Sequence, residues 1–449
     1  SHGLKRLRAV GVAGGSAWAV DQVQDLARRA AGLEDLEVDV WVERADAATL
    51  RLLEEGRVPR VAGLKVRNLS AEEAGTVGRA TSTPWLRYLV LEGASSSQLG
   101  VAGAQALALA VQPGMQLERL DCPRCYMLDE GVAVLASVLA GAKQLRELAL
   151  ASNTVRQEGM AALRELLEPG TVPLESLDMR YNEIGAVGAP EVGKLLLLNK
   201  TITNLDLRFN GIDNHGIIAL AEGLAENASL LHLNLTGNLC QIAGAERLGE
   251  AIAKNCTLRT LELDSNRLTL KGVVALSQGL MKNQGIRKLT LGGNAVKAGA
   301  KKLASALQVH PVLEWLELGA NNLEDEVVDE ICWALAANST LTHLDLSRND
   351  LTDESCEELA EMLRANSALL SLDLATCRIG DEGAAQVAEA LEANSTLRQL
   401  DLTQNVMSPV FVTKQLARLK SRVRASFQRA PVMEDEDEDE EEGSQPQQS

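Results

Sequence analysis

Cys122 and Cys125 form a CxxC pair, the spacing that supplies half of a tetrahedral zinc site. A complete site would need two more ligands at matching spacing, and the sequence has neither a second CxxC nor a nearby pair of histidines. The other five cysteines are scattered singly, which is typical of a reducing compartment. We therefore expect seven free thiols, with Cys122 and Cys125 in the core, and no bound metal.

No sequence motif of a known catalytic class is present. GxSxG, the phosphate-loop pattern GxxxxGK[ST] and HExxH are all missing, and the five histidines are dispersed along the chain. We expect no catalysis by the chain's own side chains and no cofactor, so the chain is predicted not to be an enzyme.

The chemically distinctive residues instead recur at a fixed interval, inside a Leu-x-Leu pattern. The middle positions are Asp178, Asp206, Asn234, Glu262, Thr290, Glu317, Asp345, Asp373 and Asp401. Seven of these nine are acidic, so neighbouring segments would form a stripe of continuous negative potential. The alternative is that an acid simply suits a solvated strand face.

Arginine and aromatic residues adjoin two of these leucine pairs, as Arg180-Tyr181 and Arg208-Phe209. These residue types dominate binding hot spots, and the chain has only three Tyr and three Phe. The predicted partner-binding set is Arg180, Tyr181, Arg208, Phe209, His232, Glu262, Trp315, Asp345 and Asp373. The alternative is that the two rings only shield the bend that follows them.

A repeated strand-turn-helix unit must position these residues. In residues 204–231, Leu205 and Leu207 alternate with polar residues as in a strand, and Asn210 follows at a bend. Apolar residues then recur at helical spacing up to Asn227, where we expect a left-handed helix end. The bend position recurs mostly every 28 residues, at Cys125, Asn153, Asn182, Asn210, Asn238, Asn266, Asn294, Asn321, Asn349, Cys377 and Asn405. Less regular versions at Val12, Trp41, Leu69 and Ala94 give about fifteen turns, which must stack to bury a core.

The pattern LxxLxLxxN, with a Gly six residues on, resembles leucine-rich repeats of the ribonuclease-inhibitor-like class. That class includes ribonuclease inhibitor, the Ran GTPase-activating protein and the sensing regions of NOD-like receptors. The resemblance implies an α/β solenoid shaped as a horseshoe. Strands stack about 4.8 Å apart and helices about 8–10 Å apart, so parallel strands should line the concave face and helices the convex face.

Four segments are expected along the chain. Residues 1–112 carry degenerate repeats and 113–410 carry regular ones. Residues 411–430 form a capping basic amphipathic helix, with its helical pattern over 411–428, and 431–449 form a disordered acidic tail. Net charge is −18, and nine acids lie in the run 434–442. The balance argues against nucleic-acid binding, and no apolar run is long enough to span a membrane.

The leading hypothesis is a non-enzymatic scaffold that binds a protein partner with a basic surface through its concave face. One alternative is the ligand-sensing region of a NOD-like receptor. Another is a GTPase-activating protein of the Ran type, although that family's arginine-bearing loop motif is not found. We expect a cytoplasmic location, or an organelle if a targeting peptide was removed before Ser1. A tag junction or a lost domain before Ser1 are further expectations.

Overall fold

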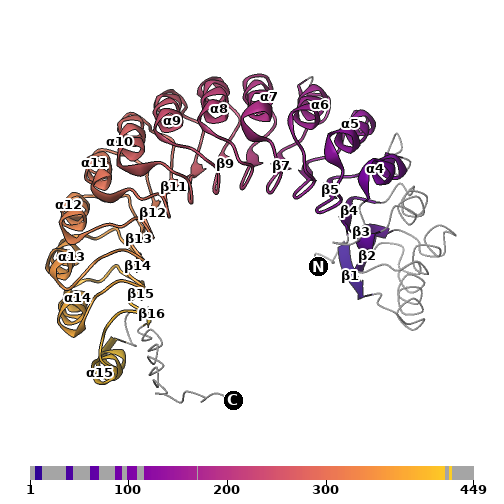
Figure 1. The fold of residues 1–449 in the computed structure, drawn as a ribbon. Helices are drawn as coiled ribbons and strands as arrows, with labels where there is room; N and C mark the ends of the chain where they lie inside the picture. The colour runs from indigo at the N-terminus through magenta and orange to yellow at the C-terminus, as the bar shows by residue number, and fades with distance from the viewer. Residues whose placement is uncertain are drawn as a thin grey trace, which may run out of the picture.

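A computed structural model describes residues 6–12, 37–43, 61–69, 86–93, 99–108, 116–168, 170–419 and 424–426. Within these residues sixteen strands form one sheet, in which every strand pairs with its neighbours in chain order (Figure 1). All the pairings are parallel. The strands line the inside of an open arc and the helices lie on its outside, as expected for a leucine-rich repeat horseshoe.

The strands of the first turns are longer than those that follow. The strands are β1 Arg6–Val12, β2 Glu37–Glu43, β3 Val61–Leu69, β4 Tyr88–Gly93, β5 Arg119–Asp121, β6 Glu147–Ala149, β7 Ser176–Asp178, β8 Asn204–Asp206, β9 His232–Asn234, β10 Thr260–Glu262, β11 Lys288–Thr290, β12 Trp315–Glu317, β13 His343–Asp345, β14 Ser371–Asp373, β15 Gln399–Asp401 and β16 Arg424–Ser426. Register shifts occur between β2 and β3 and between β3 and β4, where the sequence repeat is also irregular.

One helix follows most strands and covers the convex side. The helices are α4 Gly100–Ala108, α5 Leu128–Leu139, α6 Gln157–Leu167, α7 Gly185–Leu198, α8 Asn214–Glu226, α9 Ile242–Lys254, α10 Thr269–Leu280, the 3-10 helix η1 Lys297–Gly299, α11 Ala300–Leu307, α12 Asp325–Ala336, α13 Glu354–Ala365, α14 Asp381–Ala393 and α15 Pro409–Leu419. None of these described helices is long and apolar enough to cross a membrane.

A continuous apolar core fills the space between the sheet and the helices. In the turn that begins at β8, Leu205 of the strand, Leu207 just after it, and Leu220 and Leu224 of the helix are all fully buried. Because the leucines of successive strands pair in register, the same contact repeats from turn to turn. Each turn therefore buries its apolar face against the next.

A ladder of asparagines runs along the bends. The Nδ2 of Asn238 donates to the carbonyl oxygens of Leu207 and Leu235, at 3.0 and 2.8 Å. Its Oδ1 accepts from the backbone N–H groups of Asn210 and Ile212 in the preceding turn, at 3.2 and 3.0 Å. The prediction that the bend asparagine satisfies backbone groups beyond the strand pairing is confirmed.

A second ladder runs along the ends of the helices, and here the sequence prediction was wrong. Asn227 has φ −74° and ψ 134°, so its backbone is extended and not left-handed. Its Nδ2 donates to Leu196 O at 2.6 Å, and its Oδ1 accepts from the N–H groups of Ser229 and Leu230. The side chain therefore bridges the two turns, so the helix can end without the left-handed residue that common C-caps use.

The C-terminal helix is also shorter than predicted. Helix α15 ends at Leu419, and Arg424 lies in β16, which pairs with β15. Apolar and basic residues over 411–428 fit a helical period, but the chain returns to the sheet for one more strand. The described sheet thus extends beyond the fifteenth predicted turn, while the predicted acidic tail lies outside the described residues.

Candidate functional site

The residues between the paired leucines form one row across the concave face. Register pairs Asp206 with Asn234, Glu262 with Thr290, and Asp345 with Asp373. The row continues from Asp178 on β7 to Asp401 on β15, with each side chain half-buried except the buried Thr290. These residues are therefore direct neighbours, as the repeat predicted.

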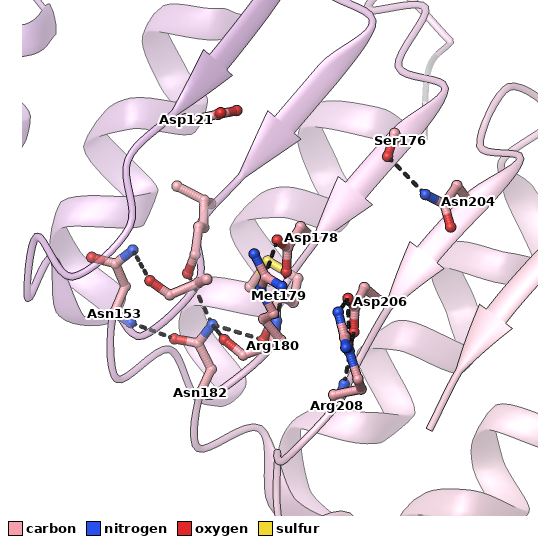
Figure 2. A network of polar contacts seen from close by, with 12 residues as sticks. Asp121, Asn153, Ser176, Asp178, Met179, Arg180, Asn182, Asn204, Asp206 and Arg208 are labelled. Atoms are coloured by element: carbon pink, nitrogen blue, oxygen red, sulfur yellow. Dashed lines mark hydrogen bonds and ion pairs between the residues drawn. The ribbon is translucent and has the colours of Figure 1, made fainter. Parts of the chain in front are cut away.

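Cations interrupt the negative charge of this row in its first half. Arg208 makes an ion pair with Asp206 at 2.6 Å, and Arg180 with Asp178 at 3.1 Å (Figure 2). Lys288 lies between Glu262 and Glu317, at 3.3 and 3.5 Å. The negative potential is therefore not continuous, which corrects the prediction.

The second half of the row keeps its negative charge. Asp345, Asp373 and Asp401 are in register on β13, β14 and β15, and none of them has an ion pair with another described residue. The Oδ1 of Asp373 accepts from the N–H of Ala375 at 2.9 Å. Burial raises the pKa of Asp373, and the neighbouring Asp345 and Asp401 raise it further. Three carboxylates are thus fixed side by side without a directly paired cation, and the more distant Arg348 offsets part of the charge at Asp373.

Tyr181 and Phe209 form the first aromatic cluster, at the bend edge of β7 and β8. Their ring centroids are 4.8 Å apart and the planes differ by 3°. Tyr181 is 54% exposed and Phe209 is 42% exposed. The Phe209 ring also lies against Gly237, where an added Cβ would be only 2.3 Å from it. The stack therefore depends on a glycine in the following turn.

The backbone that carries these rings is left-handed. In eleven consecutive turns, from Arg124 to Gln404, the residue before the bend Asn or Cys has φ between 51° and 69°. Only Gly237 and Gly293 are glycines among them. Bulky residues rarely adopt this conformation, and Tyr181 and Phe209 do so at φ 57° and 53°. The ladder bonds of the following Asn hold this bend in place.

The second aromatic cluster lies on β11 to β13. Trp315 stacks on His343 with centroids 4.1 Å apart, and the Nζ of Lys288 lies 5.2 Å from the Trp315 ring. The indole N–H of Trp315 donates to Oε1 of Glu317 at 2.6 Å. Burial lowers the pKa of His343, which favours its neutral form. The Trp315 indole is thus held by the His343 ring, the Lys288 ammonium group and the Glu317 carboxylate.

The sequence prediction included Trp315 but missed Lys288 and His343. All three precede a leucine pair, and register places them on adjacent strands. Comparing that position across turns would have revealed the cluster. His232 occupies the same position on β9, where its Nδ1 is 3.0 Å from Thr260 Oγ1, and it belongs to neither cluster.

Six of the seven cysteines belong to the core, and Cys256 is exposed. Cys122 and Cys125 are buried, as predicted, and none of the seven cysteines forms a disulfide. Burial raises the pKa of the Cys125 thiol to about 12, and its Sγ donates to Leu91 O at 3.2 Å. These two thiols are therefore protonated packing groups and not poised nucleophiles.

Known proteins with similar sequences are leucine-rich repeat proteins. The Leucine Rich repeat family profile matches residues 173–190, 198–221, 254–277, 337–360 and 365–388. Mouse ribonuclease inhibitor is 36% identical over 110 residues, which is 24% of this chain and 24% of that protein. Mouse NACHT, LRR and PYD domains-containing protein 14 is 29% identical over 119 residues, which is 26% of this chain and 12% of that protein. The matches thus cover a minor part of each relative.

Among solved structures, an internalin (inlF) from Listeria monocytogenes matches with a TM-score of 0.47 and 17% identity, over 92% of this chain and 94% of that one. The family follows from turns of one strand and one helix, an asparagine at most bends, and sequence matches to the repeat profile and to ribonuclease inhibitor. The chain is a leucine-rich repeat protein that resembles the ribonuclease-inhibitor-like class.

Proposed function

We propose that this protein is a non-enzymatic scaffold that binds a protein partner through its concave face. The observation that carries the proposal is the exposed Tyr181–Phe209 stack, which is held on a left-handed backbone beside Arg180 and Arg208. Strained positions persist where the surrounding structure enforces them and are concentrated at functional sites. Rigid aromatic side chains lose little conformational freedom on binding, which suits a hot spot.

The proposed partner touches both aromatic clusters. They are four strand spacings apart from β8 to β12, which is about 19 Å along the sheet. That span suits a folded domain better than a short peptide. The partner's basic surface would lie over Asp345 and Asp373, which make no direct ion pair with a cation of the described chain. Charge at this end would steer association, while the aromatic clusters would anchor the complex.

The test is capture of partners from an extract of the source organism, comparing wild-type protein with the double variant Arg180→Ala/Phe209→Ala. Hot-spot truncations cost about 2 kcal/mol or more each, so the variant should bind the purified partner at least about thirtyfold more weakly. Its Tm should stay close to wild type, because both side chains lie outside the leucine core.

A matched control is the double variant Leu198→Ala/Arg247→Ala on the convex helices α7 and α9, where Leu198 is exposed and Arg247 makes only exposed ion pairs. This control should retain the partner. Equal retention by both double variants would reject the concave site.

A second candidate is the ligand-sensing region of a NOD-like receptor, favoured by the match to NACHT, LRR and PYD domains-containing protein 14. The full-length gene would decide it, because such a receptor requires a phosphate-loop sequence ahead of Ser1. The six buried, unpaired cysteines suit a reducing compartment in either case.

A further inference from the structure

The charge of the convex face changes from positive to negative between α11 and α12. Residues 265–313, which include α10, η1 and α11, contain no Asp or Glu. Their lysines outside the concave strand β11 are Lys271, Lys282, Lys297, Lys301 and Lys302. Helices α12 and α13 carry eight acids and one base, namely Asp325, Glu326, Asp329, Glu330, Glu354, Glu357, Glu358, Glu361 and Arg364. Only one ion pair crosses the boundary in the described chain, from Lys301 to Glu326 at 3.5 Å. A basic surface and an acidic surface therefore lie side by side.

Two apolar side chains are exposed at this boundary. Trp333 on α12 is 69% exposed, and Val309, just after α11, is 58% exposed. Trp333 lies five residues before Asn338, the helix-end ladder residue of its turn. The same position holds Ser305 on α11 and Glu361 on α13. A tryptophan on a charged convex face is therefore a departure from the repeat, and exposed tryptophans are frequent anchors of protein interfaces.

Because the turns repeat, residues at the same distance from the helix-end ladder lie at the same position along their helix axes, which is called their height here. Counted back from the helix-end ladder, Lys302 and Glu330 are both eight residues before His310 and Asn338. Lys271 and Glu354 are both twelve residues before Asn283 and Asn366, on the helices one step further out. Opposite charges thus stand at equal heights on the two sides of the boundary.

From this arrangement we propose that the convex surface of α10 to α13 binds a second copy of this chain about a two-fold axis. The axis lies in the interface, parallel to the helices and along the α11–α12 boundary. Rotation about it keeps each residue's height and exchanges the two sides, so α12 of one copy faces α11 of the other. Lys302 then meets Glu330 of the partner copy, and Lys271 meets Glu354, each twice by symmetry.

The same rotation places the two tryptophans near the centre of the interface. Trp333 of each copy faces Ser305 on α11 of the other, between Lys302 and Val309. An indole there gains contact with the valine and a cation–π contact with the lysine, while the charge pairs surround it. Both surfaces curve away from the contact, so the interface is small and dimerisation should be weak.

Sedimentation equilibrium from about 1 to 100 µM in 0.1 M salt tests the proposal. At that ionic strength the Debye length is about 10 Å, so repulsion between two molecules of charge −18 is screened while contacting pairs persist. Wild-type protein should approach the dimer mass at the highest concentrations. Trp333→Ala should weaken dimerisation at least about thirtyfold. A wild-type monomer throughout the range would overturn the proposal.

Two charge reversals make the test specific. Lys302→Glu and Glu330→Lys each place like charges at both symmetry-related pairs, so each variant alone should be a monomer. An equimolar mixture should form heterodimers about as well as wild type, because both pairs regain opposite charges. Glu389→Lys on α14, an exposed acid away from the boundary, is the matched control and should dimerise normally.

Circular dichroism should be the same for all these surface variants. Dimers that persist in both single reversals, a mixture that stays monomeric, or a control that fails as badly as Glu330→Lys would each reject this interface. Binding of a lysine-rich peptide to the monomeric wild type would assign the acidic side of the patch to another partner.

Discussion

The two asparagine ladders run along opposite ends of the strands, and they satisfy the backbone in different ways. In the bend ladder, Asn238 accepts from N–H groups of the preceding turn. In the helix-end ladder, Asn255 accepts from the N–H groups of Thr257 and Leu258 in its own turn. Both asparagines donate to carbonyl oxygens of earlier turns. The bend ladder is therefore the more strongly coupled between turns.

Alanine substitution should reveal this difference. Asn238→Ala leaves the buried N–H groups of Asn210 and Ile212 without partners and should cost about 2–3 kcal/mol. Asn255→Ala frees one buried N–H, on Leu258, and one on the half-buried Thr257, which water can reach, so it should cost about 1–2 kcal/mol. Equilibrium urea unfolding of both variants measures the gap. A larger loss at Asn255 would reverse the proposed ranking of the ladders.

The bend edge should also be the more sensitive to added volume. Gly237→Ala puts a Cβ against the Phe209 ring at a left-handed position, so it should cost about 1–2 kcal/mol. It should also displace the aromatic stack. Gly211→Ala is a matched control, because Gly211 is left-handed too but an added Cβ there meets nothing within 4 Å. Tm and partner binding should both fall for the first variant, and only Tm for the second.

The helix-end ladder has a weak member in His310. Its Nδ1 accepts from the N–H of Leu313 at 3.1 Å, but its buried Nε2 has no partner. Burial lowers its pKa from 6.5 to about 4. The unfolded chain therefore takes up a proton near pH 6.5 while the folded chain resists until about pH 4. Stability is retained above pH 6.5 and lost as the pH falls to 4, by about 1–3 kcal/mol.

His310→Asn restores the ladder residue and removes the titrating group. We expect a gain of about 1 kcal/mol at pH 7, and a larger gain at pH 4.5. Unfolding curves at the two pH values measure this. A variant whose advantage is the same at both would show that His310 does not titrate on unfolding.

The smallest change in stability should come from replacing a left-handed residue with glycine. Ala320 has φ 56° just before a bend asparagine, where glycine carries no Cβ penalty. Ala320→Gly should stabilise the fold by less than about 1 kcal/mol, because part of the relief is offset by greater freedom of the unfolded chain. Thermal unfolding against wild type is sufficient, and a loss of stability would contradict the strain argument.

The repeat in the sequence predicted the fold because each turn has its own strand leucines and bend asparagine. Short-range pattern could not predict the end of α15. Arg424 fits a helical stripe, and only pairing with β15 makes it a strand residue. The extended backbone of Asn227 was missed for a similar reason, since its stabilising contacts reach carbonyls about thirty residues earlier.

The site was partly predictable. The row of acids followed from the period, and Tyr181 and Phe209 were identified by residue type. The ion pairs of Arg180 and Arg208 were not, because each joins an arginine just after a strand to an acid two positions earlier and depends on how the side chain folds back. The Trp315–His343 stack depends on the register between adjacent strands, which residue type alone does not predict.

The chain-ordered sheet also has a mechanical consequence. Its strands are joined in series, so a very small rotation at each pairing adds up over the whole arc and changes the distance between its ends. Each turn contributes little strain, because contacts are made with adjacent turns only. The molecule should behave as a soft spring whose opening adjusts to a partner's diameter, while the local geometry of each turn stays nearly constant.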